Sequence, residues 1–438
     1  MPDNPRPDAA DVHTSTLCLV CAGRDAPQAF DVESALEQSG LLQEEDQDGP
    51  VAEGEDVLWS RTFRLRNMPM PVLIFCVRRE PEFKPWEWTP ARWRDEEEHR
   101  LATQSRWLIM LETLYSQERP PNEEYQQHLK VAAILARDRA AACVDMDCMA
   151  LRSATTLHEL AQGDVGAAPE EMFQLHVVGG EGDCWLHTHG LRRFDLPDLE
   201  MLRVPQDMLQ DAYTTMQWLV SFLFSEYVPS EGGEFTFGAG ITAALVSLDT
   251  MLPKLGPDEL GGAADRASGD HGGWRMAVTD PGSAEIQPSA LLQAVHGDPI
   301  FWLSPYENQR RAGVARTRFG LAAAAWHSTQ FKQRALSVKV GVPYTDDGND
   351  CSELLKTPEK AEDLGREHMW FRVSAIEGGE IVGELESEPR FATWMRPGNR
   401  YRLPSSLLSG FSLLLDDVVY SPDTINELDL VTHRTGRA

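Results

Sequence analysis

The first part of the chain shows strand-like and helix-like spacing of apolar positions in turn. The apolar run 17–23 predicts a buried strand, and apolar positions at helical spacing predict a helix over 30–42. An acidic loop over 44–56 then leads to two segments, 57–66 and 71–79, whose β-branched and aromatic content favours strands. We therefore expect a small βαββ unit in this part of the chain.

The central part of the chain mixes both kinds of spacing without a regular strand–helix–strand repeat. Leu101, Leu108, Leu111 and Tyr115 recur at helical spacing, and Pro205 suits the first turn of a long core helix. The pattern predicts helices over 101–115, 125–136, 155–161 and 205–227, and strands over 140–146, 173–179 and 184–191. This mixture is typical of an α+β fold rather than a doubly wound α/β fold.

The composition shifts between Pro253 and Pro288 to Gly, Pro, Asp and Ala, and the hydrophobic periodicity fades there. We expect a linker there, although Trp274 and Met276 lie within it. After it, a helix over 307–326 and a hairpin turning at 377–379 predict a small, bent antiparallel sheet with a helix packed at its start. The expected division is a disordered tail over 1–15, an α+β domain over 16–252, a linker over 253–300 and a β-rich domain over 301–428.

The charge balance limits the partners that the protein can bind. Asp and Glu outnumber Lys and Arg by 69 to 40, which gives a net charge of −29. Such a surface repels nucleic acid and anionic membranes. It would favour a basic protein as partner, but acidic surfaces are also common in soluble proteins that bind no basic partner, and this second interpretation is the one that composition alone favours. The N-terminal segment lacks the apolar core of a secretory leader, and no apolar run approaches the ~18 residues needed to cross a bilayer, so we expect a cytoplasmic protein. Seven cysteines spread along the chain fit reduced thiols better than a disulfide framework.

The segment DCWLHTHGLRRFDLPDLEML, residues 183–202, carries the clearest candidate for chemistry. Residues two apart on a strand point to the same face, so His187 and His189 can present two imidazoles to one metal ion. A histidine on the preceding predicted strand and an acid just after the bend can complete the ligand set. Arg192 and Arg193 argue against a metal site, because they place positive charge beside it. The candidate metal ligands are His176, His187, His189 and Asp198.

The other chemical motifs are incomplete. Cys18 and Cys21 have C-x-x-C spacing, but residues three apart on a strand face opposite sides. The chain contains no G-x-S-x-G nucleophile motif and no phosphate-binding loop with its lysine. Asp145 and Asp147 could bind calcium weakly, but the spacing of a calcium loop is missing and such carboxylates are usually solvated. We therefore expect no catalytic residue and no cofactor.

The C-terminal part resembles the YegJ-like bacterial domain of unknown function. The resemblance covers roughly residues 305 to 425 and rests on the segments 367–389 and 397–404, together with the helix that precedes them. Its pattern is a tryptophan-containing strand, a G-x-L-x-x-x-P hairpin and a glycine turn before a further strand, in which Asn399 replaces the usual acid. The matching positions are Trp370, Gly383, Pro389 and Gly398.

The segment around the two histidines is similar to a T-x-G-[LM] … P-[ED]-[LI]-E signature of another uncharacterised bacterial family, which often precedes that domain. The matching positions are Thr188, Gly190, Leu191, Pro197 and Glu200. Related signatures occur in suppressor-of-fused-like proteins and in others proposed as immunity factors of bacterial toxin systems. The resemblance implies a fold and brings no catalytic residue with it.

These observations favour a cytosolic, non-enzymatic protein-binding factor, related to immunity or stress and suited to a basic partner. The alternative is a metal-dependent hydrolase that uses His187 and His189. A homo-oligomer formed through the loop from Trp86 to Trp93 is a third hypothesis, although such a loop is more often anchored to its own domain by its aromatic residues. In the 183–202 segment we expect Gly190 to permit a backbone turn and Glu200 to be buried and paired, with backbone donors or an arginine such as Arg192.

Overall fold

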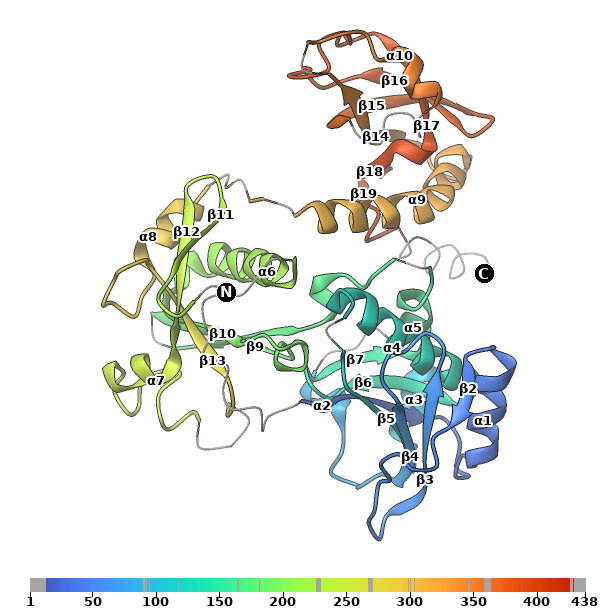
Figure 1. Cartoon of the computed structure of the whole chain (residues 1–438), viewed down its shortest axis with the longest axis vertical. Helices are drawn as coiled ribbons and strands as arrows, with labels where there is room; N and C mark the ends of the chain where they lie inside the picture. The colour runs from blue at the N-terminus through green and yellow to red at the C-terminus, as the bar shows by residue number, and fades with distance from the viewer. Residues whose placement is uncertain are drawn as a thin grey trace. The chain divides into compact units, whose positions relative to one another are not determined.

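The computed structural model divides the chain into two compact units, Met1–Ser304 and Pro305–Ala438 (Figure 1). The structure describes residues 13–89, 93, 95–116, 118–163, 165–180, 182–225, 230–266, 271–297, 299, 301–302, 304–345, 347–357, 364–425 and 428. The expected tail over 1–15 lies almost wholly outside these residues. The described residues form helices and three sheets, so the α+β class is confirmed.

The first sheet of the N-terminal unit, sheet A, has seven antiparallel strands in the order β2-β3-β4-β5-β1-β6-β7. The strands are β1 Ser15–Cys21, β2 Leu42–Glu45, β3 Val57–Leu65, β4 Val72–Arg78, β5 Trp107–Thr113, β6 Ala140–Asp145 and β7 Ala150–Ser153. The expected βαββ unit is thus part of a larger sheet, and the acidic loop over 44–56 begins inside the edge strand β2. Helices α1 Ala29–Gln38, α4 Pro121–Ala136 and α5 Ala154–Leu160 pack on one face, whereas α3 Glu96–Thr103 packs on the other.

The strand β1 shows why its sequence is apolar throughout. It lies in the middle of sheet A, and its side chains alternate between the two cores on either face. Cys18 enters the core that contains Ala102 of α3, while Cys21 enters the core that contains Leu36 of α1. The two thiols therefore diverge, as the spacing predicts, and all seven cysteines are buried and free.

The expected helix over 101–115 is wrong. The helix α3 ends at Thr103, and Trp107–Thr113 forms the strand β5 between β4 and β1. Because both faces of β5 are covered, Leu108 and Leu111 are buried on opposite sides and a two-residue alternation is not visible. An apolar run of this kind fits helical spacing as well as a buried strand.

The tryptophan-rich segment packs on its own domain over the part that the structure describes. The short helix α2 Pro85–Trp88 places Trp86 against the core under α3, with the guanidinium of Arg79 over its ring at 5.3 Å. Trp93 packs on the same core, and Trp88 is half exposed. Two of the three tryptophans thus act as internal anchors.

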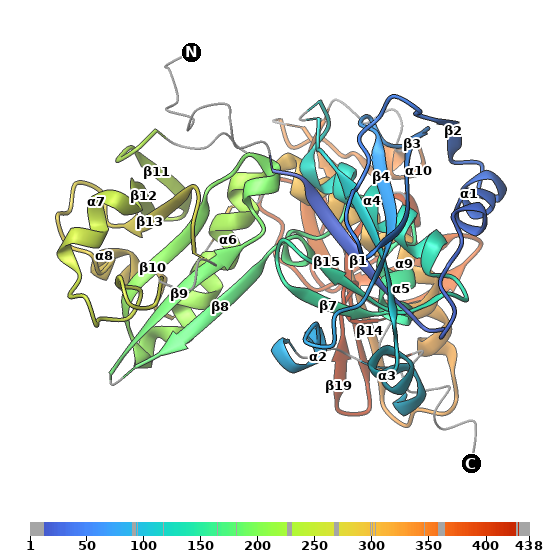
Figure 2. The same cartoon turned by 90° about the horizontal axis from the view of Figure 1, so that it is seen from below.

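The second sheet of the N-terminal unit, sheet B, has the strand order β11-β12-β13-β10-β9-β8, in which only the β10–β13 pair is parallel. Its strands are β8 Gln174–Gly179, β9 Asp183–His189, β10 Asp198–Pro205, β11 Glu234–Gly238, β12 Ile241–Ser247 and β13 Arg275–Thr279. Helices α6 Leu209–Ser225 and α8 Ser289–Val295 contribute to the core on one face (Figure 2). A smaller core on the other face is covered by α7 Leu248–Met251 and the turns that follow it.

The interpretation of residues 253–300 as a linker is wrong for the part of it that the structure describes. Strand β13 lies inside sheet B, paired with both β10 and β12, and all five of its residues are buried. The glycines serve close approach rather than flexibility. At Gly261, which has a φ of +74°, a Cβ atom would lie 2.6 Å from Leu202 and 3.2 Å from Trp185. The glycine-rich composition of this segment therefore allows it to pack closely against sheet B.

The C-terminal unit is a six-stranded antiparallel sheet, sheet C, with the order β17-β16-β15-β14-β18-β19. Its elements are α9 Pro305–His327, β14 Arg334–Tyr344, α10 Ser352–Lys356, β15 Gly365–Glu377, β16 Glu380–Leu385, β17 Arg400–Pro404, β18 Leu408–Leu415 and β19 Val418–Tyr420. The long helix α9 packs on β18 through Phe319 and Phe411. The segment 413–420 forms a hairpin that turns at Asp416 with a φ of +50°.

Of the four positions that carry the resemblance to YegJ-like domains, two lie on the hairpin of β15 and β16 and two lie after it. Trp370 is on β15, and Gly383 is on β16, where a Cβ atom would lie 2.9 Å from that of Phe371. Gly398 turns the chain into β17 with a φ of +78°, and Pro389 lies between these two strands. Over the described residues, none of the helices combines the length and apolar character needed to cross a membrane.

Candidate metal centre

The predicted histidine segment forms two strands of sheet B and the bend between them. Strand β9 ends at His189, and Gly190 turns the chain with a φ of +102°. A Cβ atom there would lie 2.8 Å from that of Cys148, so the position needs glycine for space as well as for conformation. The one-turn 3-10 helix η2, Arg192–Phe194, then leads back into β10.

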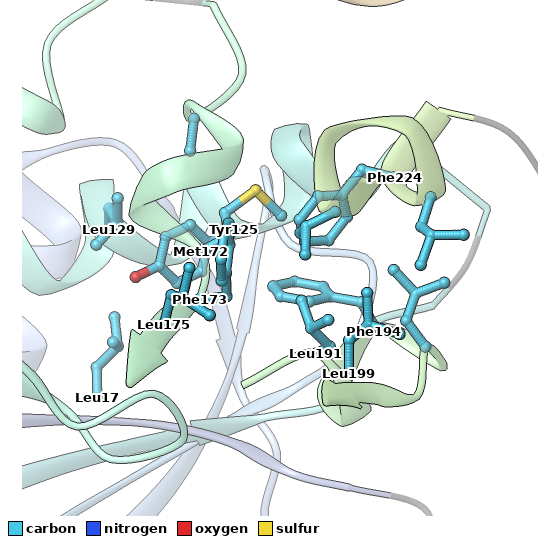
Figure 3. Packing of buried hydrophobic residues seen from close by; sticks show 14 of the residues in the cluster. Leu17, Tyr125, Leu129, Met172, Phe173, Leu175, Leu191, Phe194, Leu199 and Phe224 are labelled. Carbon is cyan, nitrogen blue, oxygen red and sulfur yellow. The ribbon is translucent and has the colours of Figure 1, made fainter. Parts of the chain in front are cut away.

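The bend is held by aromatic packing between the two sheets of the N-terminal unit (Figure 3). Phe194 stacks on Tyr115, with ring centroids 5.1 Å apart, and meets Tyr125 and Phe224 edge-on. Such contacts fix a ring more firmly than burial alone. These contacts therefore fix the position of the bend between β9 and β10.

Three histidines converge on one face of sheet B. His176 of β8 lies opposite His187 of β9, and His189 lies two residues further along β9. One ring nitrogen from each of the three lies within 4.8 Å of the others. Two nitrogens bound to one zinc ion at about 2.0–2.1 Å are about 3.4 Å apart, so small side-chain rotations bring these three onto one ion.

The environment of these histidines holds them in the form that binds metals. His187 is 2% exposed, and neither of its ring nitrogens has a hydrogen-bond partner among the described residues. Burial, followed by the neighbouring His189, lowers the pKa of His187 to about 2, and burial, followed by His176, lowers the pKa of His189 to about 3. Burial also lowers the pKa of His176. Neutral imidazoles with free lone pairs are metal ligands.

Asp198 does not join this cluster. Its Oδ1 accepts hydrogen bonds from the hydroxyl of Thr188 and the backbone N–H of Leu191, each at 3.2 Å, and its Oδ2 lies 3.4 Å from Arg192 Nε. These contacts fix the bend instead. Asp198 nevertheless lines, with His189 and Arg192, a cavity of about 230 Å³.

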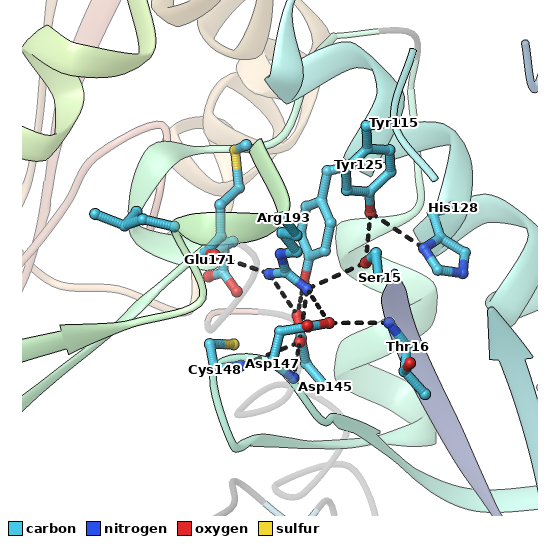
Figure 4. A network of polar contacts seen from close by, with 12 residues as sticks. Ser15, Thr16, Tyr115, Tyr125, His128, Asp145, Asp147, Cys148, Glu171 and Arg193 are labelled. Atoms are coloured by element: carbon cyan, nitrogen blue, oxygen red, sulfur yellow. Dashed lines mark hydrogen bonds and ion pairs between the residues drawn. The ribbon is translucent and has the colours of Figure 1, made fainter. Parts of the chain in front are cut away.

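The two arginines that argued against a metal site are both paired with carboxylates. Arg193 points into sheet A and donates to both carboxylate oxygens of Asp145, at 2.7 and 2.9 Å (Figure 4). It also lies 3.2 Å from Asp147. Asp145 is fully buried, so the expectation that it is solvated is wrong. Arg192 lies beside Asp198, and the charges of both arginines are thus offset.

Glu200 is fully buried and lies opposite His187 in the register of β9 and β10. It accepts hydrogen bonds from Arg266 at 2.9 and 2.5 Å, from Arg275 at 3.3 Å and from the indole of Trp185 at 2.9 Å. The expected burial and pairing of Glu200 are confirmed, with Arg266 and Arg275 in place of Arg192. Arg275 is one of the charges that lower the pKa of His187, and its ion pair with Glu200 offsets that charge at the site.

Sequence reasoning missed two aromatic neighbours of the cluster. The ring of His271 lies 4.9 Å from that of His187 and 5.6 Å from that of His189, and Trp185 stacks at 4.1 Å from His187. His271 belongs to the glycine-rich stretch interpreted as a linker. The only sequence signal is its position four residues before the apolar run of β13, which by itself indicates no site.

Known families cover only part of the chain. Residues 175–277 match the family model described as protein of unknown function (DUF4026), C-terminal. This DUF4026 C-terminal domain contains the four histidines, Glu200 and most of sheet B. No curated protein and no solved structure matches the chain. The domain therefore brings no established activity to the site.

Asp198→Asn is expected to change how stability depends on pH. Burial raises the pKa of Asp198 to about 6, so the folded state holds a proton that the unfolded state, with a pKa near 3.8, has lost. The stabilisation is present below about pH 4 and is lost as the pH rises through about 6. As the pH rises through this window, the free energy of unfolding of the metal-stripped wild type, measured with denaturant, should fall by about 1–3 kcal/mol relative to that of the variant. If the free energy of unfolding depends on pH in the same way in both proteins, the raised pKa of Asp198 is contradicted.

Proposed function

We propose that this protein binds one divalent transition metal ion through His176, His187 and His189. The observation that carries the proposal is the state of His187, which is buried between two other histidines with both ring nitrogens unbonded among the described residues. A buried polar group without a partner is costly, and a native structure retains one where it has a role. A metal ion supplies the missing partner.

The donor set supports an ion of intermediate softness. Imidazole nitrogen suits zinc, copper, nickel and iron, whereas magnesium and calcium prefer oxygen ligands. The three rings are neutral near pH 7, so binding releases no proton from them. The pairing of Arg275 with Glu200 reduces the repulsion that a cation would otherwise meet. Zinc is therefore the first ion to test.

Calorimetric titration of the metal-stripped full chain with Zn²⁺ tests the proposal. We expect one site per chain, and His187→Ala should weaken it by more than about 100-fold, because second-shell changes alone cost 10–100-fold. His368→Ala is the control, since His368 is an exposed strand histidine of sheet C that bonds Ser409. Absence of binding to the wild type, or equal affinity in His187→Ala, would overturn the proposal.

We also propose a non-enzymatic, protein-binding role, with a basic protein as the partner. The net charge of −29 supports it, because opposite charge speeds encounter and suppresses anionic partners. The resemblance of the C-terminal unit to YegJ-like domains, and the immunity or stress context of the related signatures, support it at the level of analogy. A pull-down at low and moderate salt should return a basic protein whose retention falls as salt rises. Recovery of no specific protein would count against this role.

The cavity beside His189 supports a different use of the same ion, in metal-dependent hydrolysis. Three protein ligands with an open fourth position are the arrangement of hydrolytic zinc sites, in which the metal activates a bound water. Asp198 and Arg192 line that cavity. The choice between a structural and a hydrolytic ion thus depends on what occupies the fourth position.

A further inference from the structure

The fourth imidazole beside the cluster, that of His271, arrives from a different segment of the chain. The three strand histidines have ring centroids 4.7–5.4 Å apart. His271 lies 4.9 Å from His187 and 5.6 Å from His189, which is nearly the same spacing. The ring of His271 therefore lies beside two of the three strand histidines on this face of sheet B.

The position of His271 is fixed by the structure that follows it. The carbonyl of Trp274 accepts a hydrogen bond from the backbone N–H of Asp198 at 3.1 Å, at the start of the parallel pairing of β10 with β13. Gly273 has a φ of +84°, which favours glycine, and a Cβ atom there would lie 1.7 Å from the guanidinium of Arg192. The segment between His271 and β13 thus packs directly against the bend between β9 and β10.

The ring of His271 is also packed on a hydrophobic wall. Trp185 lies 5.0 Å from it and 4.1 Å from His187, on the same strand face as the other histidines. The indole is in turn fixed by its hydrogen bond to Glu200 and by Arg266 stacked at 5.1 Å. Apolar packing of this kind excludes water from the side of the site that His271 covers.

We propose that His271 is the fourth ligand and closes the site as a four-nitrogen centre. This inference rests on the proposed metal binding by the three strand histidines. Four protein ligands in tetrahedral geometry mark a structural zinc site, whereas a hydrolytic site keeps one position open. The ion then crosslinks β8, β9 and the segment that leads into β13, and it has no vacant position for a reactive water. The site stabilises the DUF4026 C-terminal domain rather than catalysing hydrolysis.

Cobalt-loaded protein tests the fourth ligand directly, because the visible absorption of Co²⁺ distinguishes four-coordinate from higher-coordinate sites. We expect the wild type to show the intense bands of a tetrahedral site. His271→Ala should still bind one Co²⁺ but more weakly by more than the ~10–100-fold that loss of an outer-shell partner costs, with weaker bands as water enters the coordination shell. Added imidazole should restore the wild-type bands in His271→Ala. His296→Ala is the control, because His296 is exposed in the same unit and pairs with Asp211.

The outcomes separate this inference from the proposal on which it rests. If the wild type binds no Co²⁺, the three-histidine proposal itself fails. If the wild type binds Co²⁺ and His271→Ala shows the same spectrum and affinity, only the role of His271 is overturned. A spectrum of a five- or six-coordinate ion in the wild type would also overturn the closed site and would favour the hydrolytic alternative.

Discussion

Replacement of Arg193 by methionine is expected to lower the free energy of unfolding of the N-terminal unit by about 3–5 kcal/mol. The guanidinium is fully buried and is held by both oxygens of Asp145, by Asp147 and by the carbonyl of Met172 (Figure 4). Methionine keeps much of the apolar volume but leaves the buried carboxylates without a cation. Burial alone would raise the pKa of Asp145, yet Arg193 and then Arg152 lower it to about 2.

Urea unfolding measures this effect, with Arg61→Met as the control. Arg61 pairs with Glu45 on the same sheet, but its side chain is 49% exposed, so its replacement should cost at most about 1 kcal/mol. A variant at position 193 that does not fold would agree with the upper end of the range. A loss below about 1 kcal/mol would show that Arg193 does not join the two sheets.

Glu200→Gln is expected to lower the free energy of unfolding by about 3 kcal/mol or more, nearly as much as the replacement of Arg193. The substitution leaves Arg266 and Arg275 buried beside a neutral amide that cannot offset their charges. It should also weaken zinc binding, because Arg275 then repels the ion. Weaker zinc binding in a folded Glu200→Gln protein would show that Glu200 acts on the metal centre. If Glu200 only stabilised the fold, the folded variant would bind zinc as the wild type does.

Paired measurements of unfolding and of zinc affinity test the role of Glu200. Glu259→Gln is the matched control, since Glu259 pairs with Arg203 of the same sheet while its side chain is 44% exposed. We expect Glu259→Gln to lower the free energy of unfolding much less than Glu200→Gln does and to leave the zinc affinity unchanged, because exposed ion pairs contribute little to stability. Unchanged zinc affinity in a folded Glu200→Gln protein would show that the charge of Arg275 does not reach the histidines.

The spacing of apolar residues was sufficient to predict several helices and strands that bury only one face. The helix α4 and the hairpin of β15 and β16 follow directly from their three-to-four-residue and two-residue periods. Strand β5 was mistaken for a helix because both of its faces are covered. Strand β13 was missed because the turns around it are rich in glycine, which here serves close packing against Trp185 and Arg192.

Only those residues of the candidate site that lie close together in the sequence could be predicted. His187 and His189 share a face by strand geometry alone, and His176 follows once its strand is paired with β9. His271 lies 82 residues after His189 and reaches the site only through the parallel pairing of β13 with β10. The partners of Arg193 and Glu200 are equally distant in sequence, so charges that seem to oppose a metal site are offset only in the folded chain.

Elemental analysis of the full chain, purified without added metal and without a metal-affinity tag, shows whether these histidines hold a metal ion. We expect about one transition metal ion per chain in the wild type. We expect none in the His187→Ala, His189→Ala double variant, provided that the variant keeps the folded spectrum of the wild type. A metal-free wild type, or the same metal content in both proteins, would contradict the assignment of these histidines as a metal centre.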